Sequence, residues 1–100
     1  MRLFAFIGWY LMPDYLYILY SSTIDRYYIG VSTNAEKRLE YHNRARKGWT
    51  VRGRPWRLVF SKRFATRQET LDWERWLKQQ KSRLVIAKIL KNEFDWRREK

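Results

Sequence analysis

The sequence predicts a small α+β domain in the order β-β-α-β-α-α, with a small sheet and helices packed against it. Three observations support this class. Two runs of aromatic and β-branched residues stand close together near the start, and a third run follows in mid-chain. Polar capping residues precede stretches that carry apolar residues at helical spacing. A chain of 100 residues forms one domain, and a hydrophobic fraction of 45% supplies its core.

The first two strands are expected to form a hairpin. Residues 15–21 read YLYILYS, residues 26–32 read RYYIGVS, and four mostly polar residues lie between them. With a short loop of even length, Tyr17 and Tyr28 become diagonal neighbours on one face. Gly30 stands in mid-strand, where glycine weakens pairing and usually marks a bulge or a close approach by another group.

A helix is expected over residues 34–47, with Thr33 as its N-cap and Glu36 completing a capping box. Gly48 is expected to end this helix. Arg38 and His42 are four residues apart, so they share one face of it and lie beside the stripe that turns towards the sheet.

The second half of the chain contains one more strand and two helices. Residues 49–54 are basic and turn-like, and residues 56–64 alternate well enough for a third strand. Thr66 and Glu69 form a second capping box that opens a helix to about Lys81. Ser82 is expected to cap the last helix, whose apolar stripe is made by Val85, Ile86, Ile89 and Leu90.

Domain boundaries are expected after residues 11 and 91. Residues 1–11 form an apolar extension that is shorter than the roughly 20 residues needed to span a bilayer and has no cleavage site. Three roles remain open for it: an added strand or arm, a partner-binding tail, or an upstream start in a protein that naturally begins at Met12. Residues 12–91 form the domain, and residues 92–100 form a charged tail that is expected to fray.

The composition points to a polyanionic partner. Lysine and arginine number 22 against 10 acidic residues, which gives a formal net charge of +12. From Tyr41 to Gln68 the chain carries nine basic residues and no acid, and arginine, whose planar guanidinium suits phosphate, predominates. Aromatic residues are interleaved there, as expected where bases stack. Nucleic acid is therefore the expected partner, and an anionic membrane surface is the main alternative. The residues expected to contact nucleic acid are Arg44, Arg46, Lys47, Arg52, Arg54, Arg57, Arg63 and Lys78.

Several classes of site are excluded. Without cysteine the chain has no disulfide, thiolate nucleophile or thiolate metal site, and a single histidine excludes a multi-histidine zinc site. Glu74 lies at the border of an apolar helical stripe, where it is either a salt-bridge partner or a lone carboxylate suited to Mg²⁺. Taken singly, His42 also fits a structural histidine, Arg38 a solvated charge, and the strand tyrosines ordinary β formers.

Together these residues resemble the GIY-YIG nuclease domain, in its small single-domain branch related to the nuclease module of the UvrC repair protein. The resemblance covers about Tyr15 to Leu90. It is carried by Tyr15-Leu16-Tyr17, Tyr28-Ile29-Gly30, Arg38, His42-Asn43, the run GRPWRLV at 53–59 and the run WERWLK at 73–78. The first motif departs from Gly-Ile-Tyr but keeps its tyrosine, and a late polar residue, often asparagine in larger nucleases, has no clear match.

The resemblance implies a three-stranded antiparallel sheet flanked by helices and metal-dependent hydrolysis of DNA phosphodiesters. It makes Tyr17, Tyr28, Arg38, His42 and Glu74 the catalytic residues, with Glu74 holding one Mg²⁺ or Mn²⁺ ion. Arg38 is expected to neutralise charge on the phosphate, and either Tyr17 or His42 to take the proton of the attacking water.

The expected function is thus a DNA endonuclease, structure-specific and acting in repair or recombination. The alternative is a non-catalytic nucleic-acid-binding module on the same fold. A membrane-surface role that uses the apolar extension is a third reading, although no membrane partner is expected. A protein partner or a homodimer is expected to help select the site. The lack of a signal segment and of cysteine favours the cytoplasm.

Overall fold

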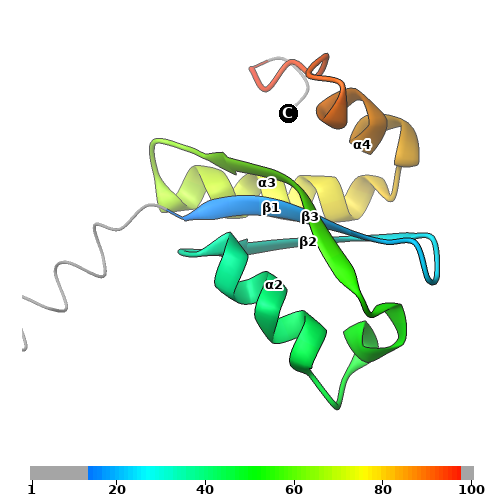
Figure 1. Ribbon diagram of the computed structural model, residues 1–100. Helices are drawn as coiled ribbons and strands as arrows, with labels where there is room; N and C mark the ends of the chain where they lie inside the picture. The colour runs from blue at the N-terminus through cyan, green and yellow to red at the C-terminus, as the bar shows by residue number, and fades with distance from the viewer. Residues whose placement is uncertain (1–13, 98–100) are drawn as a thin grey trace, which may run out of the picture.

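The computed structural model describes residues 14–97, which form a three-stranded sheet with helices on both faces (Figure 1). In chain order the elements are β1 (Tyr15–Ser21), β2 (Arg26–Ser32), α2 (Ala35–Arg44), the short 3-10 helix η1 (Trp49–Gly53), β3 (Trp56–Arg63), α3 (Arg67–Gln80) and α4 (Arg83–Leu90). This order confirms the predicted α+β class, and the turn-like segment after α2 is the one that forms η1. The apolar extension over residues 1–11 lies outside the described residues.

The sheet is antiparallel, in the order β2-β1-β3. β1 is central, which fits its almost wholly apolar and aromatic sequence, and it pairs with both neighbours over its full length. A register shift between Ile18 and Leu19 marks an irregularity in the pairing with β3. Because β1 lies in the middle, β2 is an outer strand whose free edge is open to other groups.

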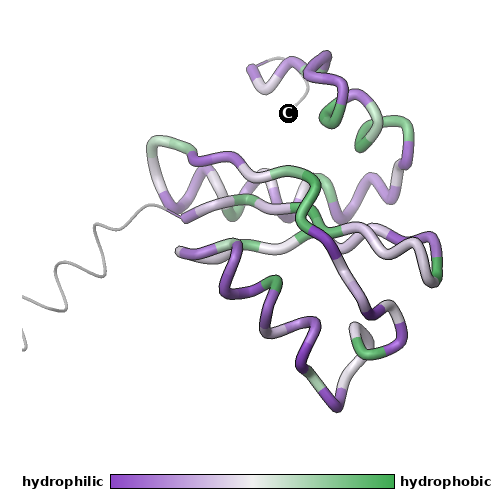
Figure 2. Tube along the Cα trace, in the orientation of Figure 1, coloured by the Kyte–Doolittle hydropathy of each residue, from purple (hydrophilic) through white to green (hydrophobic). Residues whose placement is uncertain are grey.

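Alternate residues of β1 supply two separate cores. Leu16 and Ile18 pack with residues of α3 and α4, whereas Tyr17 and Leu19 pack with α2 and with Trp56. Figure 1 shows α2 and α4 on opposite sides of the sheet. In Figure 2 the hydrophobic positions gather where the strands cross, while α2 is hydrophilic along most of its length. The period-two alternation of a strand buried on both faces explains this division.

Two of the three predicted helix N-caps, Thr66 and Ser82, are confirmed. The Thr66 hydroxyl accepts from the Glu69 amide, and the Ser82 hydroxyl from the Val85 amide. The prediction of Thr33 as the cap of α2 is wrong, because Asn34 is the N-cap and its side chain accepts from the Lys37 amide at 3.0 Å. Asparagine caps at least as well as threonine, so the stronger cap one residue later starts the helix.

The helix α2 also ends earlier than the predicted residue 47, at Arg44. Its end is held by tertiary contacts. The Asn43 carboxamide donates to the Trp56 carbonyl at 2.9 Å and accepts from the Trp56 amide at 2.6 Å. Gly48 does not end the helix but lies in the following loop with φ of 96°, a conformation that glycine adopts without strain.

The segment after α4 packs against the molecule, so the expectation that the chain frays from Asn92 is wrong for residues 92–97. Phe94 is buried in the core beside α3 and α4, and the Trp96 ring lies edge-on to the Trp73 ring at a centroid distance of 5.0 Å. Two aromatic anchors thus outweigh the charged residues around them. No helix within residues 14–97 has the length and the apolar character to span a membrane.

Candidate active site

Tyr17 lies across the outer strand β2 because Gly30 leaves room for it. The two residues are paired in the register of β1 and β2, and Tyr17 is only 1% exposed. A Cβ atom at position 30 would collide with the hydroxyl and the ring of Tyr17. The glycine in mid-strand is therefore explained by a close approach, as the sequence indicates.

Tyr17 begins a buried chain of polar contacts that ends at η1. Its hydroxyl lies 3.3 Å from His42 Nε2, and His42 Nδ1 lies 3.2 Å from the Thr50 hydroxyl. His42 and Thr50 are both buried. The Thr50 carbonyl in turn accepts a 2.6 Å hydrogen bond from the indole N–H of Trp56. These contacts fix the plane of the imidazole and direct one nitrogen to the phenol.

The surroundings keep both members of the Tyr17–His42 pair neutral. Burial raises the pKa of Tyr17; the Arg38 side chain opposes this shift, while Tyr28 and Glu74 add to it. Burial, followed by the positive charge of Arg38, lowers the pKa of His42 from its ordinary value. At neutral pH the pair is thus a phenol beside an uncharged imidazole, and the imidazole is the stronger proton acceptor.

Tyr28 adds a second phenol to this cluster, diagonal to Tyr17 as predicted. The centroid of its ring lies 6.3 Å from that of Tyr17 and 4.7 Å from that of His42. On the other side the Tyr28 ring is nearly parallel to the Trp49 ring, at 6.5 Å and 27°. The two motif tyrosines are therefore joined with η1 in one aromatic cluster.

Arg38 and Glu74 bring opposite charges towards this cluster from different helices. Arg38 extends from α2, is half-buried, and its guanidinium lies 4.5 Å from the centre of the Tyr41 ring. Glu74 extends from α3, and its side chain is 22% exposed. Both act on the pKa of Tyr17, in opposite directions. Two helices that pack on opposite faces of the sheet thus each contribute a charge that acts on Tyr17.

The chemistry of the Glu74 carboxylate fits a hard divalent cation. Within residues 14–97 no three potential metal-ligating side chains cluster, so the protein would supply few ligands. Mg²⁺ is commonly held by one or two carboxylates, with waters and substrate phosphates completing its coordination. Glu74 Oε2 currently accepts from Lys78 Nζ at 3.2 Å, so a cation at this position would compete with an ammonium group.

Comparison with known protein families matches residues 13–88 to the GIY-YIG catalytic domain, which is more than half of the chain. The chain belongs to this family. Separate comparisons with curated proteins and with solved structures give no match. GIY-YIG domains are nuclease domains, and their enzymes generally use a divalent metal and act on DNA. The relation to UvrC is consistent with this membership.

All eight basic residues predicted to contact nucleic acid are exposed in this GIY-YIG domain, but they do not form one cluster. Five of them lie at the corner formed by the end of α2 and by η1, namely Arg44, Arg46, Lys47, Arg52 and Arg54. Arg57 and Arg63 occupy β3, where their guanidinium groups lie over the rings of Tyr20 and Tyr15. Lys78 is paired with Glu74 on α3. The contact with nucleic acid stays a prediction for all eight.

Two residues lie at the candidate site although no sequence pattern links them to His42 or Tyr28. Thr50 is a buried threonine in a short turn-like segment, and nothing local indicates that its hydroxyl contacts His42. Trp49 is, by sequence, only one of several aromatics in a basic stretch, yet it is 50% exposed beside Tyr28. Both reach the site because η1 folds back over α2 and β2. Only the tertiary structure makes that contact visible.

Proposed function

We propose that this protein is an endonuclease that hydrolyses DNA phosphodiester bonds with one divalent cation, Mg²⁺ or Mn²⁺. The observation that carries the proposal is the Tyr17–His42 pair, held neutral beside Arg38 and Glu74 at one edge of the sheet. It combines a proton acceptor, a cation for the phosphate and a carboxylate for the metal, which are the parts that phosphodiester hydrolysis requires.

Tyr17 and His42 share the proton transfer. A water oxygen bonds to phosphorus and the bond to the leaving oxygen breaks. The water gives a proton to the Tyr17 oxygen as the Tyr17 proton passes to His42 Nε2, 3.3 Å away. This needs the His42 tautomer that carries its proton on Nδ1 and donates it to the Thr50 hydroxyl. A relay of this kind avoids the free phenolate that burial disfavours.

Arg38 and Tyr28 act on the phosphate. The Arg38 guanidinium neutralises the charge that grows on its oxygens in the transition state, and the Tyr28 hydroxyl orients water or phosphate. Glu74 would hold the divalent cation, which when bound supplies further neutralisation of the phosphate and of the leaving oxygen. The basic residues at the corner of α2 and η1 contribute affinity through the backbone without reading sequence.

The biological setting is proposed from the family relation. It is the cleavage of flaps, branches or nicks in repair or recombination, in the cytoplasm, and membership of a nuclease family is consistent with it. A protein partner or a second copy that selects the site is part of the same proposal. A non-catalytic binding module is the second candidate, and the ion pair that Lys78 makes with the Glu74 carboxylate favours it.

Cleavage of labelled linear, flapped and branched DNA in Mg²⁺, Mn²⁺ or EDTA tests the proposal. We expect cutting that requires metal and that Glu74→Gln abolishes, while DNA binding stays within about twofold because the backbone contacts remain. Glu69→Gln, on an exposed position of the same helix, is the matched control and should cut like the unchanged protein. Cutting by Glu74→Gln at the full rate would show that the metal assignment is wrong, and binding without cutting on every substrate would favour the binding module.

A further inference from the structure

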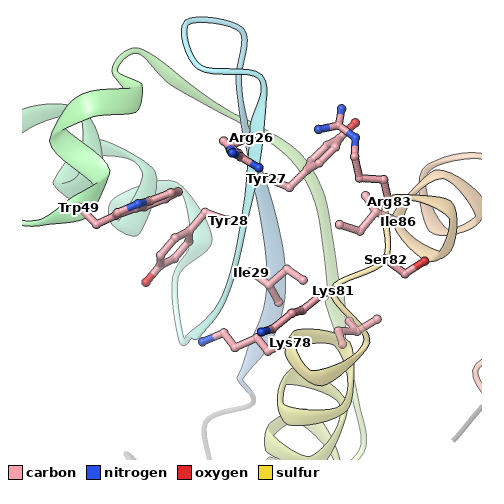
Figure 3. A pocket seen from close by; sticks show the side chains of 11 residues that line it. Arg26, Tyr27, Tyr28, Ile29, Trp49, Lys78, Lys81, Ser82, Arg83 and Ile86 are labelled. Atoms are coloured by element: carbon pink, nitrogen blue, oxygen red, sulfur yellow. The ribbon is translucent and has the colours of Figure 1, made fainter.

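A groove of about 460 Å³ follows the free edge of β2 (Figure 3). Trp49 of η1 and Tyr28 of β2 form one side of it. The other side is formed by the end of α3 and the start of α4, including Lys81 and Ser82. The groove is thus continuous with the candidate active site at Tyr28 and extends away from it around the outer strand.

The wall at Trp49 offers a flat aromatic surface. The Trp49 side chain is 50% exposed, and its ring lies within 27° of parallel to the Tyr28 ring behind it. The Tyr28 ring in turn packs against His42 at a centroid distance of 4.7 Å, so Trp49 and Tyr28 are supported by the candidate active site. The centroid of the Trp49 ring also lies 5.8 Å from that of the Trp56 ring, so the three rings pack together, and a planar group stacked on the exposed part of Trp49 would extend this aromatic cluster.

The rest of the lining is cationic at the rim and apolar below. Arg26, Lys78, Lys81 and Arg83 line the groove, and no acidic residue does. Arg83 and Lys78 are engaged by Asp25 and Glu74, whereas no ion pair of Arg26 or Lys81 is found within the part of the chain described. The apolar part of the lining is Ile29, Leu77 and Ile86. A ligand that matches this surface has a flat, largely apolar body and negative charge, as a nucleotide has.

We propose that the groove binds a nucleotide that is not paired in a duplex, with its base on Trp49 and the phosphates on either side of this nucleotide near Arg26 and Lys81. A base inside a duplex is covered on both faces by its neighbours and has no face free for Trp49, and the groove has the size of a site for one small ligand. The substrate class is therefore DNA with a single-stranded segment next to the cleaved bond. The inference rests on the proposed function, because the groove begins at Tyr28 and Lys78.

Fluorescence anisotropy in EDTA tests the groove without cleavage. The probes are a labelled single strand of about twelve nucleotides and a blunt duplex of the same sequence, at one fixed salt concentration. Trp49→Ala is expected to weaken binding of the single strand by about 5- to 150-fold and of the duplex by no more than about twofold. Trp49→Phe, which keeps a ring, should lose less than about fivefold.

A charge variant keeps the test informative if Trp49→Ala fails to fold. Lys81→Gln changes an exposed side chain at the end of α3, and Lys91→Gln, exposed after α4 and outside the groove, is its matched control. Lys81→Gln should weaken single-strand binding more than Lys91→Gln does. Equal losses in the two lysine variants, or equal losses on single strand and duplex for Trp49→Ala, would overturn the proposal.

Different results would contradict the nuclease proposal and the groove proposal. If the unchanged protein cuts no DNA in Mg²⁺ or Mn²⁺, yet Trp49→Ala loses single-strand affinity alone, the groove stands and the nuclease assignment falls. If the protein cuts continuous duplex and Trp49→Ala cuts and binds every probe as before, the nuclease assignment stands and the groove proposal falls.

Discussion

At the scale of single residues, the proposed proton transfer depends on an uncharged histidine. His42 is buried between the phenol of Tyr17 and the hydroxyl of Thr50, and both burial and Arg38 lower its pKa. An imidazolium would have no free nitrogen lone pair to accept a proton from the phenol. The neutral form is therefore the one that both the packing and the proposed proton transfer require.

This depressed pKa predicts how stability changes with pH. In the unfolded chain His42 takes up a proton near its ordinary pKa of about 6.5, whereas in the folded protein it resists protonation. Between the two values the unfolded state binds more protons, so the contribution of His42 is fully present above about pH 6.5 and is lost as the pH falls towards the folded pKa.

Urea unfolding from pH 5 to pH 8 measures this contribution. We expect the free energy of unfolding to fall more steeply below pH 6.5 in the unchanged protein than in His42→Gln, because the glutamine has no proton to take up. The other titrating groups are common to both proteins and cancel in the difference. Parallel curves, or a steeper fall in the variant, would contradict the assignment of a neutral buried histidine.

At the scale of elements, the two ends of α2 have different causes. Neighbouring side chains set its start, and contacts with residues distant in the sequence set its end. Its start is decided by two adjacent residues that both have side chains able to cap, Thr33 and Asn34. In the structure the Asn34 carboxamide accepts from the Lys37 amide, and the Asn34 amide donates to the Ser32 hydroxyl at 3.1 Å. This second contact holds Asn34 in the extended conformation of a cap.

A pair of alanine variants tests which residue caps the helix. Asn34→Ala should lower the free energy of unfolding by about 0.5 to 2 kcal/mol, since an amide of the first turn loses its acceptor. Thr33→Ala, one position away, should change it by less than about 0.5 kcal/mol. Urea denaturation of both variants measures the difference, and a larger loss for Thr33→Ala would return the cap to that residue.

Elements marked by local signals were predictable from the sequence, and those fixed by distant contacts were not. The hairpin, β3 and the caps at Thr66 and Ser82 depend on residues a few positions apart, so periodicity and capping patterns indicate them. The end of α2 depends on Asn43 reaching Trp56, and the packing of Phe94 depends on a core assembled from other elements. No window of neighbouring residues contains that information.

The residues of the candidate site also fall into those that the sequence predicts and those that it does not. Strand alternation and helical spacing place Tyr17, Tyr28, Arg38 and His42 on definite faces, and the structure brings them together. Their expected catalytic roles come from the resemblance to the GIY-YIG domain. Thr50 could not be predicted, because it contacts His42 only through the path of the chain around η1. Patterns of one element indicate which way a side chain points, but not what it meets.

At the scale of the whole molecule, the excess of positive charge predicts a steep salt dependence of DNA binding. A protein that neutralises phosphates releases counterions, so the logarithm of the affinity falls linearly with the logarithm of the salt concentration. The net charge is +12, and five exposed basic residues stand together at the corner of α2 and η1. These five residues are expected to account for much of the slope of affinity against salt concentration.

Replacing two members of the corner tests that distribution. The double variant Arg46→Gln and Lys47→Gln should reduce the slope for duplex DNA by about 1 to 2, roughly one for each phosphate that the variant no longer neutralises. Lys88→Gln combined with Lys91→Gln, on exposed positions in and just after α4, is the control of equal charge and should leave the slope unchanged. Anisotropy titrations at several salt concentrations give the slopes. Equal reductions in both double variants would mean that net charge alone, and not its placement, governs binding.

The overlap between the Tyr17 phenol and the space above Gly30 also limits the order in which this sequence can change over generations. A methyl group at position 30 would meet the Tyr17 hydroxyl and ring, so a larger residue fits there only after position 17 has become smaller. A chain with a larger residue at position 30 is therefore expected to lack the hydroxyl that contacts His42. Positions 17 and 30 are therefore expected to change together, which an alignment of related sequences would test.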